Sequence, residues 1–216
     1  MDENTWYVSL FGGVSWQEDI ETTSEATLVS PGVSFDTTFE FKSGYLAGAA
    51  IGARLSDIGL DWFRLEAEAS YTRYKGDSYD YEPAGGGAVA SGSGDLEGHL
   101  EAIYVLGNLW IDLDLGMGLV PYIGGGAGVA FLDLDANYVP TNFGIASDRT
   151  EFAFQAGGGV KWWMSDSVAL EVGYRFRGIP DVEFEATGSV SNTFGTQFDD
   201  DDLYSHHVLG GLTLGF

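Results

Sequence analysis

Residues 63–72 read FRLEAEASYT, and this stretch decides the class of fold. Every odd-numbered position in it is apolar, and every even-numbered position is polar or charged. Successive side chains of a β-strand point to opposite faces of a sheet, so the pattern predicts a strand with one apolar and one polar face. An amphipathic helix would instead need apolar residues at every third or fourth position.

The same alternation recurs in seven further segments, which lie near residues 6–16, 45–55, 97–112, 122–131, 152–162, 168–176 and 204–216. The connections near 18–38, 76–95, 133–149 and 177–203 are long, whereas those near 56–61, 113–118 and 164–167 are short. Bacterial outer-membrane barrels have short periplasmic turns and longer extracellular loops. We therefore predict an all-β fold: an eight-stranded antiparallel up-and-down transmembrane β-barrel with four long extracellular loops and three short periplasmic turns. Residues 1–216 would form this single domain, with both termini on the periplasmic side.

Composition narrows the class of protein. No stretch of about 18 residues is continuously apolar, which excludes a transmembrane helix, but a spanning strand needs only about 9–11 residues. The chain has 0 Cys, so disulfides and thiolate metal sites are excluded, and its net charge of -24 argues against nucleic-acid partners. No leader follows Met1, so we expect a mature outer-membrane protein whose signal peptide was removed, with a cytoplasmic protein as the alternative.

The polar face of the strands indicates which side meets lipid. A soluble lipocalin-like barrel would turn the apolar face inward. Here, however, the polar face combines both signs of charge with many small residues, and an eight-stranded barrel has room inside only for side chains. We expect an interior charge network that closes the barrel, with a gate in a narrow conduit as the alternative. Its predicted members are Arg54, Arg64, Glu66, Glu68, Lys161, Glu171 and Arg175.

Aromatic residues concentrate at the ends of the predicted strands. Amphipathic rings favour the lipid headgroup level, so these positions predict an aromatic girdle. The predicted members are Trp6, Trp16, Trp62, Trp110, Trp162, Tyr174 and Tyr204. Trp residues that merely cap a soluble core are the alternative interpretation.

Carboxylates crowd the predicted loops and end in the run Asp199, Asp200, Asp201 and Asp202. Hard divalent cations bind clustered carboxylates, so this run is a candidate for weak Ca²⁺ binding. A solvated acidic surface is the favoured interpretation. The sequence predicts no cofactor and no other metal site.

Several segments resemble those of a known superfamily. They are RLEAEASY at 64–71, PYIGGGAGVAF at 121–131, FQAGGGVKW at 154–162, VALEVGYRFRG at 168–178 and HHVLGGLTLGF at 206–216. The whole chain resembles the eight-stranded outer-membrane antigen and opacity-protein superfamily of Gram-negative bacteria, and within it the P44/Msp2-type surface antigens. The resemblance implies contact with outer-membrane lipid and lipopolysaccharide. It also implies that the outer-membrane insertion machinery reads the terminal pattern Tyr204, Leu212, Leu214 and Phe216.

Three histidines are the remaining candidates for chemistry. His99, His206 and His207 are predicted near the extracellular rim, and some barrels of this kind modify lipid A with His and Ser. Ser205 and His207 share a face, but that face points inward and no third group is fixed by spacing. The predicted function is therefore a non-enzymatic outer-membrane protein that displays acidic loops to an unidentified extracellular partner. The alternatives are a narrow porin-like channel and a lipid A-modifying enzyme.

Overall fold

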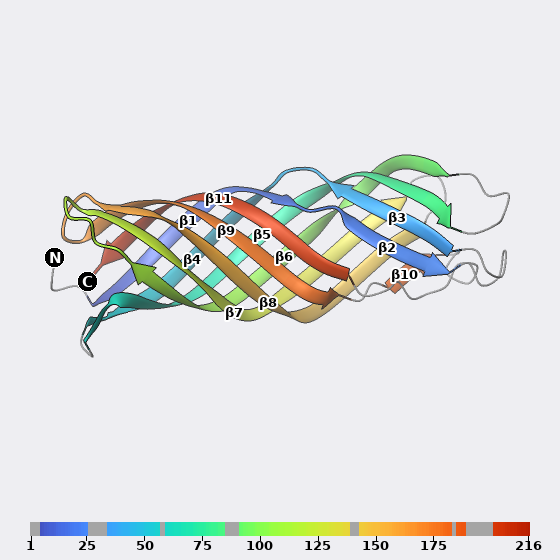
Figure 1. Ribbon diagram of the computed structural model, residues 1–216. Helices are drawn as coiled ribbons and strands as arrows, with labels where there is room; N and C mark the ends of the chain where they lie inside the picture. The colour runs from blue at the N-terminus through green and yellow to red at the C-terminus, as the bar shows by residue number, and fades with distance from the viewer. Residues whose placement is uncertain are drawn as a thin grey trace.

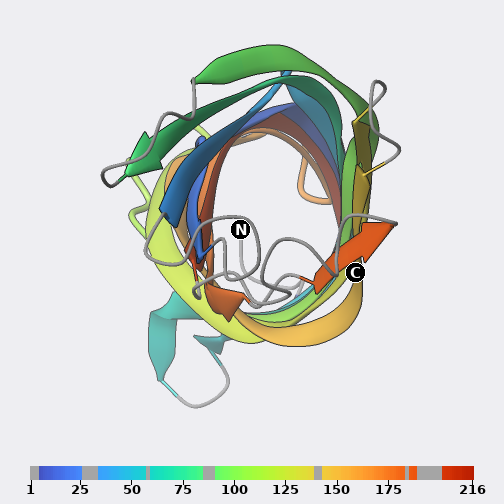
Figure 2. The ribbon, with the colours of Figure 1, turned by 90° about the vertical axis from the view of Figure 1, so that its right-hand side faces the viewer.

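The chain forms a closed antiparallel barrel in the computed structural model, which describes residues 5–25, 34–56, 59–84, 91–138, 143–182, 185–188 and 201–216. Figure 1 shows the barrel from the side, and Figure 2 shows its strands as a closed ring. The strands are β1 (Trp6–Gln17), β2 (Ile20–Glu25), β3 (Ser34–Phe41), β4 (Gly44–Leu55), β5 (Leu60–Ala84), β6 (Gly92–Asp112), β7 (Leu119–Tyr138), β8 (Phe143–Trp163), β9 (Val168–Val182), β10 (Glu185–Gly188) and β11 (Asp201–Gly215). Among the described residues, no helix has the length and apolar character needed to cross a membrane.

Eight of these strands make the ring. Their order is β5, β4, β1, β11, β9, β8, β7, β6 and back to β5. The first and last strands close it, with β1 and β11 paired from Tyr7 opposite Gly215 to Gln17 opposite Ser205. β2 and β3 form a hairpin that lies beyond the ends of β1 and β4. Along β5, β4 is the partner of one part of the strand and β3 is the partner of the next part. The prediction of an eight-stranded antiparallel barrel is confirmed.

The two ends of the barrel differ. Trp6 and Phe216 exchange backbone hydrogen bonds of 3.3 and 2.9 Å, so both termini lie at one end, which we call the terminal end. The short connections after β4, β6 and β8 lie there too, as predicted from their length. The opposite end is called the loop end.

Much of the sequence expected in the long loops is strand. β5 runs to Ala84 and β6 begins at Gly92, while β7 runs to Tyr138 and β8 begins at Phe143. Outward positions in these extensions are polar, as at Asp80 and Asp133. The strands therefore continue beyond the segment in which apolar residues alternate, which is why the predicted strands were too short.

The barrel wall separates an apolar outside from a closely packed inside. Outward side chains such as Leu10, Ile123 and Val172 are exposed, which is the arrangement of a lipid-facing surface. On β6 the odd-numbered residues face outward and the even-numbered residues inward, the orientation expected for residues 97–112. The faces are thus opposite to those of a soluble barrel.

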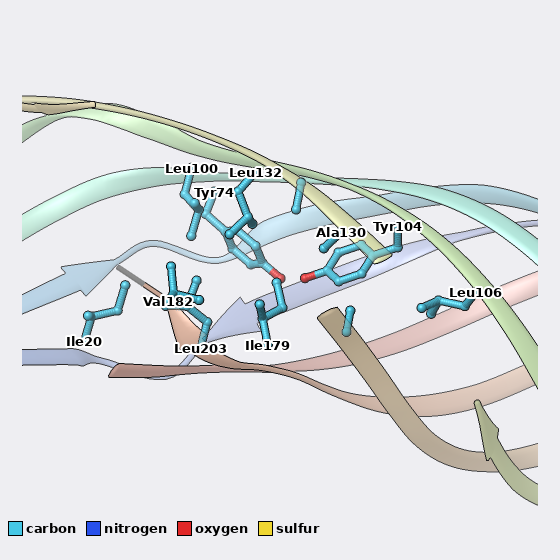
Figure 3. Close-up of a cluster of buried hydrophobic side chains, with 12 residues drawn as sticks. Ile20, Tyr74, Leu100, Tyr104, Leu106, Ala130, Leu132, Ile179, Val182 and Leu203 are labelled. Atoms are coloured by element: carbon cyan, nitrogen blue, oxygen red, sulfur yellow. The ribbon is translucent and has the colours of Figure 1, made fainter. Parts of the chain in front are cut away.

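The interior changes character along the axis. Near the terminal end it is charged, whereas towards the loop end it holds a cluster of buried hydrophobic side chains (Figure 3). This apolar cluster consists of Ile20, Tyr74, Leu100, Ala102, Tyr104, Leu106, Ala130, Leu132, Ala153, Ile179, Val182 and Leu203, with Phe39 and Phe41 packed against it. The apolar cluster was not predicted, because the whole interior was expected to be lined by polar or small side chains.

Candidate functional site

Arg64 lies at the centre of the charged interior. Its Nε donates to both carboxylate oxygens of Asp112 at 2.8 and 2.7 Å, and its Nη1 donates to the Tyr7 hydroxyl at 2.7 Å. The guanidinium also lies over the rings of Tyr7 and Tyr122, at 5.4 and 5.3 Å from their centroids. This buried charge is therefore both paired and hydrogen-bonded, which is the condition under which burial is tolerated.

Glu66 is the next member, two positions along β5. Its Oε2 accepts from the Tyr7 hydroxyl at 2.8 Å, and its Oε1 accepts from Trp110 Nε1 at 3.0 Å and from Asn108 Nδ2 at 3.2 Å. The Arg64 Nη1 lies 3.7 Å from Oε2. Four inward side chains thus share one carboxylate, so a change at any of them alters the surroundings of Glu66.

Glu171 joins two cations, Lys161 on the neighbouring strand β8 and Arg175 on its own strand β9. Its Oε2 lies 3.3 Å from Lys161 Nζ, and its Oε1 lies 3.5 Å from Arg175 Nη2. The Tyr122 hydroxyl donates to the same carboxylate. Arg175 also lies over the Trp110 ring, with 4.2 Å between its Cζ and the ring centroid.

Glu68 and Arg177 form the tier nearest the apolar cluster. Arg177 Nη2 donates to Glu68 Oε1 at 2.5 Å, and Gln155 and Asn108 each donate to Glu68 Oε2 at 2.9 Å. The Arg177 guanidinium lies over the Tyr104 ring, 4.5 Å from its centroid. This tier places a buried, hydrogen-bonded ion pair next to the apolar cluster.

The buried charges of the described interior balance. Four are cations and four are carboxylates: Arg64, Lys161, Arg175 and Arg177 with Glu66, Glu68, Asp112 and Glu171. We call these eight residues the charge network. Because burial penalises an unpaired charge strongly, this neutral arrangement favours a packed interior over an open, ion-attracting one.

Three positions differ from the predicted network, because Arg54 lies outside it, whereas Asp112 and Arg177 belong to it without having been predicted. Arg54 is only half-buried and lies over the Trp163 ring, 5.5 Å from its centroid, and no ion pair joins it to the network among the described residues. Arg177 was not predicted, because the strand was expected to end at Phe176. Its signal was present, however, since it continues the inward parity of Arg175.

The predicted aromatic girdle divides between the ends of the barrel. Trp6, Trp62 and Trp162 are exposed on the outer wall at the terminal end. Trp16 and Tyr174 are exposed at a second level towards the loop end.

Trp110 does not belong to that girdle. It is 0% exposed and points inward, where its indole donates to Glu66. The prediction was wrong because even-numbered positions of β6 face the interior. A position at the end of a strand suggests a girdle, but the even number of Trp110 places its side chain on the inward face of β6.

His206 lies on the outer wall within a group of aromatic rings. It stacks with Trp16 at 6.1 Å between centroids, and its Nδ1 lies 2.6 Å from the Tyr174 hydroxyl. Its Nε2 lies 2.7 Å from Glu18 Oε1. Tyr204 lies beside this group, stacked on Phe176 at 5.5 Å.

The other two histidines lie elsewhere. His207 is buried inside the barrel, with its Nε2 3.0 Å from Ser205 Oγ. No carboxylate contacts its Nδ1 among the described residues. His99 lies 3.5 Å from Glu101 on the extension of β6. The three histidines therefore do not form one site.

The acidic run lies largely outside the described residues. Asp199 and Asp200 are not described, and of Asp201 only the backbone is. Asp202 is exposed and accepts from the Tyr204 hydroxyl at 2.6 Å. Within the part of the chain that is described, no group of three His, Cys, Asp or Glu residues could hold a metal ion.

The loop-end wall also holds a surface ion pair. Lys42 Nζ lies 2.8 Å from Asp77 Oδ1, and the hydrogen bond to that carboxylate raises the pKa of Lys42. Both side chains are well exposed, so this pair contributes little to stability.

The last strand carries the predicted insertion signal on its outer face. Leu212, Leu214 and Phe216 are exposed along β11, and Tyr204 is half-buried against Phe176. These side chains therefore lie on the lipid-facing side of the wall.

Comparisons with known proteins agree with the barrel. The family model described as "Outer membrane protein beta-barrel domain" matches residues 2–215. The outer membrane protein PagN of Salmonella typhimurium is 24% identical over 184 residues, which cover 81% of this chain and 74% of PagN.

Two solved structures share the architecture. The outer membrane protein OprG from Pseudomonas aeruginosa aligns with a TM-score of 0.62 at 12% identity, covering 97% of this chain and 96% of OprG. The outer membrane protease OmpT from Escherichia coli aligns with a TM-score of 0.56 at 10% identity, covering 100% of this chain and 98% of OmpT. At such identities the likeness concerns the fold alone, and a fold does not decide whether a chain is an enzyme.

Proposed function

Because this chain belongs to the outer membrane protein β-barrel domain family, we propose that it is a non-enzymatic surface protein whose closed barrel displays an acidic wall and acidic loops outside the cell. Family membership makes it an integral protein of the bacterial outer membrane. Its closer likeness to the P44/Msp2-type surface antigens stays a prediction.

The orientation we propose puts the terminal end in the periplasm and the loop end outside. It is supported by the short connections at the terminal end and by exposed carboxylates on the wall beyond the second aromatic level, such as Asp80 and Asp133. The outer wall between the two aromatic levels would contact lipid and, in the outer leaflet, lipopolysaccharide. The outward side chains of β11 would be recognised by the insertion machinery.

The observation that carries the proposal is the charge network. Four cations and four carboxylates fill the interior near the terminal end, and each carboxylate is paired. An eight-stranded barrel leaves little space beyond its own side chains. This supports a scaffold for external surfaces over a narrow porin-like channel.

Conductance across planar lipid bilayers tests this role. The native protein should show no stable conductance step at moderate voltage. The Glu68→Ala variant, which disrupts the tier nearest the apolar cluster, should show at most brief openings. A large and long-lived open state of the native protein would establish the channel alternative instead.

The acidic surface suggests the class of extracellular partner. With a net charge of -24, the chain attracts cations at long range and repels anions. We propose a cationic protein or peptide as the partner. Polylysine should bind vesicles that contain the protein and dissociate as salt is added, whereas heparin should not bind. Preferential binding of heparin would contradict the proposed partner class.

The enzyme alternative depends on Ser205 and His207. Both side chains are buried inside the barrel, away from lipid, and the described residues provide no carboxylate to orient His207. This supports a non-enzymatic role. Mass spectra of lipid A from cells with and without the protein should be identical, and a new modification would revive the enzyme alternative.

A further inference from the structure

The turn between β6 and β7 exposes apolar side chains at the terminal end of the barrel. Leu113, Leu115 and Met117 are at least half exposed there, and the exposed fraction of Met117 reaches 88%. Leu119, on the returning strand, and Met164, in the turn after β8, are exposed as well. We call these five residues the turn patch.

Backbone hydrogen bonds hold the turn patch together. Leu115 N donates to the Leu119 carbonyl oxygen at 3.1 Å, which continues the β6–β7 register into the turn. Trp163 N donates to the Gly118 carbonyl oxygen at 2.8 Å, so the turns after β6 and β8 lie side by side (Figure 1). Leu113 and Leu115 therefore continue the outward, odd-numbered positions of β6.

Met117 occupies the tip of the turn at a conformational cost. Its φ of 57° lies in the left-handed region, which glycine and asparagine adopt more readily than a residue with a long apolar side chain. The charged residue of the turn, Asp114, is used within it, because its carboxylate accepts from Gly116 N at 2.8 Å. The turn therefore holds an apolar side chain at a position that a glycine would fit with less strain.

The turn patch is the end of a continuous apolar row on the outer wall. From Ile103 to Leu115, every outward position of β6 and its turn is apolar or glycine. At about 3.3 Å per residue and a strand tilt of about 40°, this row covers roughly 30 Å along the barrel axis. The apolar band of an outer-membrane barrel is about 25 Å tall, so the row exceeds the band by roughly 5 Å.

Charged residues fix the other limit of this row, towards the loop end. Arg73, Glu101 and Asp133 share one level of β5, β6 and β7, since Glu101 is opposite each of the other two. The excess therefore lies at the terminal end. On β5 the apolar row is shorter there, because the exposed Asp61 takes the outward position level with Leu113 when the β5–β6 register is continued.

Trp162 gives an independent measure of the level of the patch. It is exposed on the outer wall and lies opposite Leu119 in the β7–β8 ladder. Tryptophan rings favour the lipid headgroup level. The patch therefore begins at that level and extends from it to the tip of the turn.

We propose that the turn patch is buried in the lipid leaflet at the terminal end, at the boundary between headgroups and acyl chains, where it anchors the β6–β7 side of the barrel. Interfacial helices bury their apolar faces by about 5–10 Å into this boundary, which is comparable with the excess of the row. That this leaflet is the periplasmic one rests on the orientation proposed above.

Continuity with the lipid-facing wall supports lipid as the occupant. Protein interfaces surround an apolar centre with a polar rim. Here the outward surface passes from Leu115 through Leu113 to Ile111 without a polar side chain between them. A protein that covered the patch would therefore have to displace lipid from the adjoining wall.

Fluorescence quenching by lipid tests the proposal on the folded protein in phosphatidylcholine vesicles. The chain has 0 Cys, so Met117→Cys introduces a single site for an environment-sensitive fluorophore. Phospholipid with a nitroxide near the top of its acyl chain should quench this label strongly. Ser56→Cys, in the exposed turn after β4, is the matched control and should be quenched several-fold less.

A second variant tests whether Met117 holds the turn in the lipid. With the label at Leu115→Cys, the further substitution Met117→Asp should lower the quenching by about two-fold, because interfacial binding scales with the buried apolar area. Asp adopts a positive φ more readily than Met, so the turn itself should persist. Gel mobility before and after boiling verifies that each variant is folded.

Equal quenching of the labels at positions 117 and 56 in folded protein would overturn the proposal. So would quenching of the Leu115→Cys label that Met117→Asp leaves unchanged. The vesicles contain only this protein and neutral phospholipid, so a failure of the proposed cationic partner or of the closed interior would leave these results as they are.

Discussion

Arg177 and Glu68 form a buried ion pair of 2.5 Å although 109 residues separate them in the sequence. The pair joins β9 to β5 across the interior of the barrel, and these strands are not neighbours in the ring. It therefore fixes the cross-section of the barrel in a way that backbone pairing between adjacent strands does not.

Removing one partner of this pair should be costly. Glu68→Ala would leave Arg177 buried without its carboxylate, and we expect the free energy of unfolding to fall by about 3–5 kcal/mol. Urea unfolding of the protein in lipid vesicles measures this free energy. The double variant Glu68→Leu/Arg177→Met should recover much of the loss, because no unpaired charge remains. Equal stability of the native protein and the single variant would contradict the assigned pairing.

Trp110 should be shielded from lipid. Brominated acyl chains quench tryptophans that they contact, so Trp62 and Trp162 on the outer wall should be quenched, whereas Trp110 should not. Trp110→Phe is therefore expected to raise the quenched fraction of the total fluorescence, and Trp162→Phe to lower it. If Trp110→Phe lowered the quenched fraction and Trp162→Phe raised it, Trp110 would belong to the lipid-facing girdle.

Gly52 should not tolerate a side chain. A Cβ there would lie 2.3 Å from the Tyr7 hydroxyl and 2.8 Å from a backbone oxygen of Leu65. Gly52→Ala should destabilise the barrel by about 1–3 kcal/mol, because the Tyr7 contacts to Arg64 and Glu66 would have to shift. Gly107→Ala is the matched control, since its nearest neighbour would be 3.9 Å away. Comparable losses in the two variants would show that the close approach at Gly52 has no special effect.

The closed ring should survive detergent at room temperature. Unboiled protein is expected to migrate faster on a denaturing gel than boiled protein, because the barrel stays compact until heated. Disrupting the β1–β11 closure with Leu212→Pro, which removes a backbone donor within that ladder, should abolish the fast form. Leu115→Pro, in the exposed turn after β6, is the control variant and should keep the fast form. The same mobility of the native protein before and after boiling would contradict a closed barrel.

The sequence was most informative where lipid restricts it. A strand in lipid must be apolar at every second position, so the eight strands and the inward direction of Arg64 could be predicted from alternation. Beyond the lipid that restriction ends, and the extensions of β5 to β8 were expected as loops. Arg177 was missed for the same reason, because its strand was predicted to end at Phe176, whereas β9 runs to Val182.

The apolar cluster was hidden by a related ambiguity. Where the inner face is also apolar, as at Leu100 and Leu106 on β6, the alternation disappears and the two faces look alike. Which side chains then meet across the interior depends on the register of strands far apart in the sequence.

The pairing of β1 with β11 has a consequence for biogenesis. Ser9 and Thr213 share a hydrogen bond of 2.8 Å across 204 residues, so the edge of the first strand has no permanent neighbour until almost the entire chain is present. Exposed strand edges invite pairing with other chains. Until β11 pairs with β1, one edge of each of these strands is open to other chains, and their pairing converts an aggregation-prone ribbon into a wall with no edge.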